Sequence, residues 1–214
     1  MRIYHGAPSP ANMRRCREAA PSYTHGACWT PAKMTPHEWP YFVDNGAYGG
    51  DFDPVEWRRT LDELGGMPYE PDWIVLPDVF NSAAGTATRH REHVDAVHDR
   101  DLTPAAVLQP GRPVVEQMTL AVELGADAVF VGGDKGWQRR AGDEIVSLAE
   151  QAGLHTHLGN PGSADRLIWA ERAGFDSVDT SSILQNQYFG WLERLEDAED
   201  ATPTQQPTLS EVGG

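Results

Sequence analysis

The sequence predicts an α/β protein with the compact (β/α)8 barrel fold of the TIM type. Short apolar segments of β-forming residues alternate with helix-like stretches almost to the end of the 214 residues, which is typical of parallel strands joined by right-handed crossovers. These segments provide eight strand candidates, which favours a closed barrel over an open doubly wound sheet. The length fits one such barrel with short connections.

The strand candidates are short apolar runs, several of which end in a carboxylate, an amide or a glycine. In chain order they span 1–4, 23–28, 41–44, 73–78, 105–109, 128–132, 156–159 and 177–179, and the second has the weakest pattern. Helices are expected between them at 54–64, 84–100, 113–124, 143–152 and 163–173. Asp53 before Pro54 is an N-cap signal, and C-cap glycines end four of the helices, namely Gly65, Gly125, Gly153 and Gly174.

Composition bounds the domain organisation and the compartment. Hydrophobic residues make up 40% of the chain, which is enough for a packed core. After Trp191 the sequence becomes acidic and then rich in Thr, Gln and Pro, so we expect one barrel domain at 1–196 and a disordered tail at 197–214. No stretch has the length and apolarity of a membrane helix or signal peptide, which predicts a cytoplasmic protein. Having only Cys16 and Cys28, the chain lacks a disulfide framework and a four-cysteine zinc site.

The net charge is strongly negative, at a formal −15, and by itself argues against a nucleic-acid partner. The residues from Glu193 onward include six acidic residues and one arginine, so this segment carries −5 of the charge. Lys33 and Lys135 are the only lysines. A surplus of carboxylates with few lysines suits a halophilic cytoplasm or a high-GC genome, and it predicts highest activity at high salt.

Polar residues and glycines gather at the ends of the predicted strands, where the active sites of parallel barrels lie. They are Asp44, Asp78, Gln109, Gly132, Gly133, Gly159 and Asp179. Each Asp alone is more often a helix cap or turn residue, and Gly132-Gly133 alone is consistent with a tight turn or a phosphate cradle. Their coincidence at one mouth is difficult to explain by capping alone, and it predicts a binding site.

Two carboxylates, a carboxamide and a backbone N–H suit the edge of a guanine-like base. The carboxylates would accept from N1–H and the exocyclic amine, while the amide and the N–H would donate to O6. Tyr48 would stack on one face of the base and Leu158 would cover the other. Asp179 would attack the sugar carbon that bears the base, since an oxocarbenium-like transition state suits a carboxylate nucleophile. His157 is interpreted as a core histidine or one that supports this pocket.

These residues resemble the tRNA-guanine transglycosylase superfamily. The family's base-recognition motif Asp-Ser-Gly-Gly-(Phe/Tyr) is similar to Asp-Asn-Gly-Ala-Tyr at 44–48, and the Asp that ends its next strand is matched by Asp78. Its Val-Gln-Gly and Val-Gly-Gly resemble Leu-Gln-Pro at 108–110 and Val-Gly-Gly at 131–133. Its last motifs resemble His-Leu-Gly at 157–159, Asp-Arg-Leu at 165–167 and Gly-Phe-Asp-Ser-Val-Asp at 174–179, the most specific match.

The resemblance implies roles for these residues. Asp179 would be the nucleophile that forms a covalent glycosyl-enzyme while guanine leaves, and Asp44 the acid/base. Three residues would hold the heterocycle, Asp78, Gln109 and Gly133, between Tyr48 and Leu158. A 7-deazaguanine such as preQ0 or preQ1 would then attack the same carbon, with net retention. The resemblance implies no cofactor.

The departures from the family's sequence pattern indicate which nucleic acid, DNA or tRNA, would be the substrate. The family's tRNA enzymes carry a Cys-x-Cys-x-x-Cys…His zinc site after the nucleophile strand, and no Cys follows Cys28 here. A barrel without this zinc subdomain resembles the DNA-guanine transglycosylases of phages, archaeal viruses and bacterial modification islands, which implies a DNA substrate and, for a viral source, the host cytoplasm. Asn45 and Ala47 are tolerable replacements, whereas Pro110 removes one backbone donor.

Candidate contacts to the nucleic acid follow the sixth strand. They are Lys135, Trp137, Arg139 and Arg140, which would help to grip a nucleotide that has left the duplex stack. An ordinary solvated helix start explains them equally well. So small a barrel also suggests a homodimer or a helper protein.

Three other interpretations remain open. One is the same exchange on tRNA. Another is a metal-dependent hydrolase or lyase in which Asp44, Asp78 and Asp179 are ligands. The last is an inert barrel that binds a nucleobase or a protein.

Overall fold

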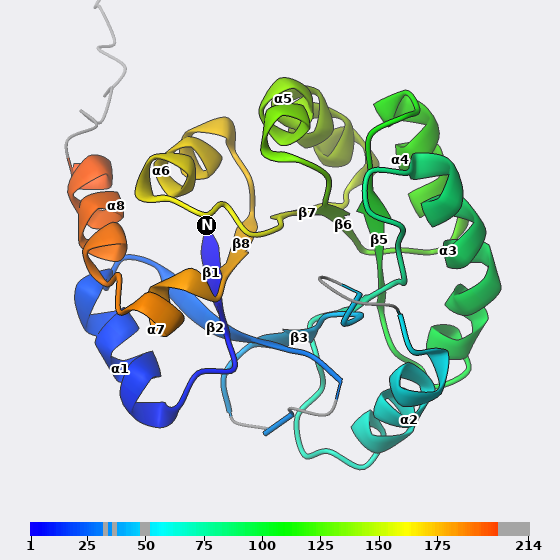
Figure 1. Cartoon of the computed structure of the whole chain (residues 1–214), viewed down its shortest axis with the longest axis horizontal. Helices are drawn as coiled ribbons and strands as arrows, with labels where there is room; N and C mark the ends of the chain where they lie inside the picture. The colour runs from blue at the N-terminus through cyan, green and yellow to red at the C-terminus, as the bar shows by residue number, and fades with distance from the viewer. Residues whose placement is uncertain (32–33, 36–37, 48–51, 201–214) are drawn as a thin grey trace, which may run out of the picture.

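A computed structural model describes the chain except residues 32–33, 36–37, 48–51 and 201–214 (Figure 1). Its strands form one closed barrel in the order β1 to β8, and every neighbouring pair is parallel. The predicted (β/α)8 barrel is therefore confirmed. The strands are β1 (Arg2–Gly6), β2 (Thr24–Trp29), β3 (Tyr41–Val43), β4 (Ile74–Val75), β5 (Pro104–Leu108), β6 (Ala128–Val131), β7 (His155–Leu158) and β8 (Ser177–Thr180).

The helices surround the barrel, as Figure 1 shows. They are α1 (Pro10–Ala19), α2 (Pro54–Leu64), α3 (Ala83–His98), α4 (Val114–Glu123), α5 (Lys135–Ala152), α6 (Ala164–Ala173), α7 (Ser182–Asn186) and α8 (Gly190–Asp200). Helix α2 has the predicted bounds, with the Asp53 carboxylate capping the N–H groups of Val55 and Glu56. Helices α1, α7 and α8 were not among the five predicted.

Two predicted boundaries are wrong. Helix α5 begins at Lys135 rather than 143, because Asp134 caps its first turn while Gly136 and Gly142 interrupt the apolar pattern that marks a helix. Helix α8 continues to Asp200, so the tail predicted from 197 begins inside a helix. The apolar residues Leu192 and Leu195 of α8 are buried, which anchors this acidic segment against α1 and α6. Residues 201–214 lie outside the described part.

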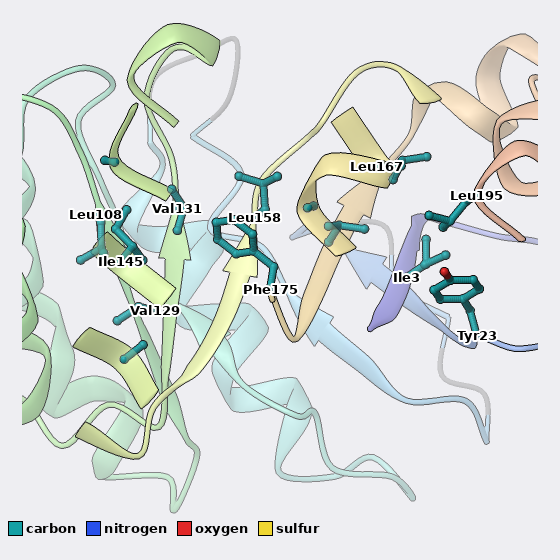
Figure 2. Close-up of a cluster of buried hydrophobic side chains, with 14 of the residues drawn as sticks. Ile3, Tyr23, Leu108, Val129, Val131, Ile145, Leu158, Leu167, Phe175 and Leu195 are labelled. Carbon is teal, nitrogen blue, oxygen red and sulfur yellow. The ribbon is translucent and has the colours of Figure 1, made fainter. Parts of the chain in front are cut away.

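Buried side chains form an inner and an outer layer. Alternation along the strands sends one set of side chains into the barrel, where Tyr4, Phe42, Trp73 and Phe130 pack together. The alternate residues, such as Val131 and Leu158, point outward and share a cluster with helix residues such as Ile145 of α5 (Figure 2). The inner layer fills the barrel interior, so the strand-end residues that follow β3 to β8 lie above it, at the carboxyl end of the barrel, which we call the mouth.

Candidate active site at the barrel mouth

The predicted site residues lie at the carboxyl ends of consecutive strands. Asp44, Asp78 and Gln109 follow β3, β4 and β5, while Asp179 is the third residue of β8. Because all eight strands are parallel and the barrel is closed, these positions share one end of the molecule. The buried Cys28 of β2 lies between the carboxylates, since both Asp179 and Asp44 raise the pKa of its thiol beyond the effect of burial.

Asp179 is held by one of its two carboxylate oxygens. Its Oδ1 lies 3.1 Å from Nε2 of the buried His157 and accepts a hydrogen bond of 3.0 Å from the backbone N–H of Asn160. Its Oδ2 accepts no hydrogen bond from the described residues, and the side chain keeps 16% of its surface exposed. One oxygen is thus held by two donors, while the other has no partner among the described residues.

Asp44 has a strongly perturbed carboxyl group. Burial is the main cause that raises its pKa from 3.8 to about 7, and the negative charges of Asp179 and Asp78 raise it further. A hydrogen bond of 2.8 Å from the backbone N–H of Gly46 opposes this shift. A carboxyl group that titrates near neutral pH can both donate and accept a proton during a reaction.

Asp78 is clamped between two amide side chains. The Asn45 amide donates to its Oδ1 at 2.9 Å, and the Gln109 amide donates to its Oδ2 at 2.6 Å. Arg89 donates to its backbone carbonyl at 2.5 Å. Burial still raises the pKa of Asp78, although both amides and Arg89 oppose the shift. The clamp therefore fixes the plane of the carboxylate at the mouth.

Gln109, predicted to hold the base, contacts protein groups through both ends of its amide. Its side chain is 1% exposed, and while its Nε2 donates to Asp78, its Oε1 accepts from the backbone N–H of Asn81 at 3.0 Å. Its backbone N–H and carbonyl are bound by the buried Gln117 amide. These contacts use one N–H of the amide to support Asp78, so direct contact of Gln109 with a base stays a prediction that depends on the second N–H.

The three glycines of the predicted site allow close packing. A Cβ at Gly132 would lie 2.5 Å from Gln109 Nε2, and one at Gly159 would lie 2.6 Å from the Phe130 ring. Gly133 has a φ of 73°, in the left-handed region, and a Cβ there would meet Pro110 and Trp137. The backbone N–H of Gly133 has no acceptor within the described residues, so it is available to a ligand.

The two side chains predicted to sandwich a base have different outcomes. Leu158 is fully buried and packs outward among the helices (Figure 2), so the prediction that it covers the base is wrong. The reason is strand alternation: the neighbouring His157 points into the barrel, and Leu158 therefore points away from it. Tyr48 lies outside the described residues.

Among the predicted nucleic-acid contacts, Lys135 is affected by the charge of Asp179. Burial and then Arg166 lower its pKa to about 8, while Asp179 raises it. The guanidinium of Arg139 lies 4.6 Å from the Trp169 ring centre on α6, and Trp137 is half-buried against the core. Arg140 is exposed.

Sequence reasoning missed several residues that shape the mouth. Asn45, Asn160, Cys28 and Arg89 contact or surround the three carboxylates, yet none has a role that its residue type reveals. The one available signal was position, since Asn45 and Asn160 follow strand ends.

Comparisons of the sequence with known protein-family models and with curated proteins give no match. The resemblance to guanine transglycosylases rests on the motifs alone.

In the part of the chain that the structure describes, no three His, Cys, Asp or Glu side chains group so that they could hold a metal ion. The alternative in which three carboxylates bind a divalent ion thus lacks a ligand set there. None of the described helices is both long and apolar enough to cross a bilayer.

Proposed function

We propose that this protein is a base-exchange glycosyltransferase that replaces guanine in DNA with a 7-deazaguanine through a covalent Asp179 intermediate. The observation that carries the proposal is the arrangement of Asp179 and Asp44: a carboxylate with one free oxygen lies beside a carboxyl group that titrates near pH 7.

Asp179 would attack through Oδ2. Two donors hold Oδ1 and stabilise the carboxylate, so Oδ2 carries the accessible lone pair. In the first displacement, Oδ2 forms a bond to the anomeric carbon, and the bond from this carbon to guanine N9 breaks with its electron pair leaving on the base. In the second, a deazaguanine forms the new bond and Asp179 leaves, so that configuration is retained.

Asp44 would manage the proton. At neutral pH its carboxyl group is protonated in a substantial fraction of molecules, because its pKa is about 7. It can protonate the departing guanine and, once ionised, accept the proton that the incoming deazaguanine must lose.

The base would be read by Asp78 and Gly133. Each oxygen of Asp78 accepts one amide hydrogen bond and retains a lone pair for the N–H groups of a guanine edge. The free N–H of Gly133 supplies the donor for O6. Gln109 contributes indirectly, since it fixes the Asp78 carboxylate.

The test is incubation of the full chain with guanine-containing DNA or tRNA and radiolabelled guanine, preQ0 or preQ1, at several salt concentrations. We expect label in DNA with the wild type and none with Asp179→Ala or Asp44→Asn. Asp165→Asn is the matched control, because this carboxylate is 81% exposed and pairs with Arg194 of α8. Incorporation into tRNA alone would change the substrate, and incorporation into neither polymer would overturn the proposal.

A further inference from the structure

A line of polar groups crosses the barrel interior below Asp179. His157 Nε2 lies 3.1 Å from Asp179 Oδ1, and His157 Nδ1 lies 2.8 Å from the hydroxyl of Ser177. The same hydroxyl lies 2.7 Å from Nε2 of His155. His155 lines a cavity of about 500 Å³ at the amino-terminal end of the barrel, together with Arg2 and Asp176.

For a neutral His157, donor and acceptor chemistry gives this line one direction. An ionised Asp179 only accepts, so His157 donates from Nε2. In a neutral imidazole the other nitrogen, Nδ1, must then accept, and Ser177 donates to it. The Ser177 oxygen in turn accepts from Nε2–H of His155. Every donor points toward Asp179, and every buried polar atom in the line has a partner.

Packing keeps the His157 ring in this orientation. The side chain is fully buried, stacks on Phe130 with ring centres 4.7 Å apart, and meets the edge of Phe42 at 4.8 Å. A ring flip would require these aromatic neighbours to move.

His155 is neutral at physiological pH. Burial is the main cause that lowers its pKa to about 4, and the positive charges of His157 and Arg2 lower it further. The negative charges of Asp176 and Asp72 act in the opposite direction. Its ring lies 4.7 Å from that of Trp73. When this neutral ring carries its proton on Nε2, it donates to the Ser177 oxygen. The Ser177 hydroxyl then donates to His157 Nδ1 at 2.8 Å, a shorter contact than the 3.5 Å to the Thr156 carbonyl.

We propose that His157 is the positioning residue of the reactive carboxylate, and that Ser177 and His155 hold it in the tautomer that donates to Asp179 Oδ1. The reactive role of Asp179 in this inference rests on the proposed function. The orientation and tautomer of His157 rest on the hydrogen-bond geometry alone. Because these hydrogen bonds hold Oδ1, they leave Oδ2 as the reacting oxygen and fix the direction in which Oδ2 points.

The direct test is the tautomer of His157, which needs no substrate. Long-range ¹H–¹⁵N correlation spectra of the ¹⁵N-labelled full chain distinguish protonated from bare ring nitrogens, and single substitutions of His155 and His157 assign the signals. We expect a neutral His157 with its proton on Nε2 in the wild type. A proton on Nδ1 of His157 overturns the inference.

Removal of the Ser177 hydroxyl should release this constraint. In Ser177→Ala we expect a mixture of His157 tautomers, because Nδ1 no longer has a donor. Thr180→Val is the matched control: Thr180 lies on the same strand, is fully buried, and its hydroxyl has no hydrogen-bond partner among the described residues. Unchanged His157 signals in Ser177→Ala, or equal changes in both variants, contradict the proposal.

Exchange kinetics separate this inference from the proposed function. We expect kcat in Ser177→Ala to fall roughly tenfold or more, with KM changed less than about twofold. The acidic limb of the pH–rate profile should move to higher pH, because a weaker hydrogen bond from His157 favours the ionised carboxylate less. Thr180→Val should match the wild type. The expected tautomer in a chain that exchanges no base overturns the proposed function and supports only the hydrogen-bonded arrangement of His157. Wild-type kcat and pH profile in Ser177→Ala overturn the positioning role.

Discussion

The buried carboxyl group of Asp44 should destabilise the fold at alkaline pH. Its pKa rises from 3.8 in an unfolded chain to about 7 in the folded protein, so the folded state binds more protons between these values. Stability from this group is therefore lost as pH rises from about 4 to 7. At about 1.4 kcal/mol per pKa unit, the loss is about 4 kcal/mol, reduced to about 2 to 4 kcal/mol because the side chain is partly exposed.

Asp44→Asn removes this cost. Asparagine keeps an oxygen that can accept from the Gly46 N–H, but it cannot become charged beside Asp179 and Asp78. We expect the variant to be more stable than the wild type at pH 8 by about 2 to 4 kcal/mol, and by little at pH 4. The same variant should exchange no base, so that stability and activity change in opposite directions.

Urea unfolding at a series of pH values measures this difference. The control is Asp165→Asn, whose carboxylate is 81% exposed and should give a difference that does not vary with pH. A difference between Asp44→Asn and the wild type that stays constant from pH 4 to 8, or that favours the wild type at pH 8, would refute the assignment of Asp44 as a high-pKa acid/base.

Three other predictions concern the wider structure. Acidification from pH 7.5 to 5 should lower the free energy of unfolding by about 2 kcal/mol for each of His5 and His90, because burial lowers both pKa values to about 3; urea unfolding of His90→Gln should show about 2 kcal/mol less acid sensitivity. Gly132→Ala should cost about 1 to 3 kcal/mol in thermal or urea unfolding and raise KM for the base, because its Cβ would displace Gln109; an unchanged KM would contradict the clamp on Asp78. Exchange activity should increase with salt, and a maximum below about 0.2 M would contradict the halophilic interpretation.

The fold could be predicted because the barrel depends on patterns that a sequence displays. Apolar runs, cap residues such as Asp53 and C-cap glycines mark the elements locally. The start of helix α5 was predicted too late in the chain, since its first turns hold Gly136 and Gly142. Glycine is required at position 142, because a Cβ there would lie 2.8 Å from the Trp169 ring. At such positions the residue type is set by a contact between two helices, which a local sequence pattern does not reveal.

The sequence predicted the carboxylates of the candidate site but not the side chains and backbone groups that hold them in place. Asp44, Asp78 and Asp179 follow or end strands, so the parallel barrel alone places them at one mouth. The direction of Leu158 and the contacts of Gln109 depend on strand phase and on partners far away in sequence. Those contacts form only when the barrel closes.

The most direct test of the account is capture of the covalent intermediate. The full chain is incubated with guanine-containing DNA in the absence of a free base, denatured rapidly and analysed by intact mass and peptide mapping. The account predicts an adduct that carries the nucleic acid, lacks the released guanine and maps to Asp179, and that is lost in Asp179→Ala. An adduct at another residue, or base exchange without any adduct under single-turnover conditions, would contradict it.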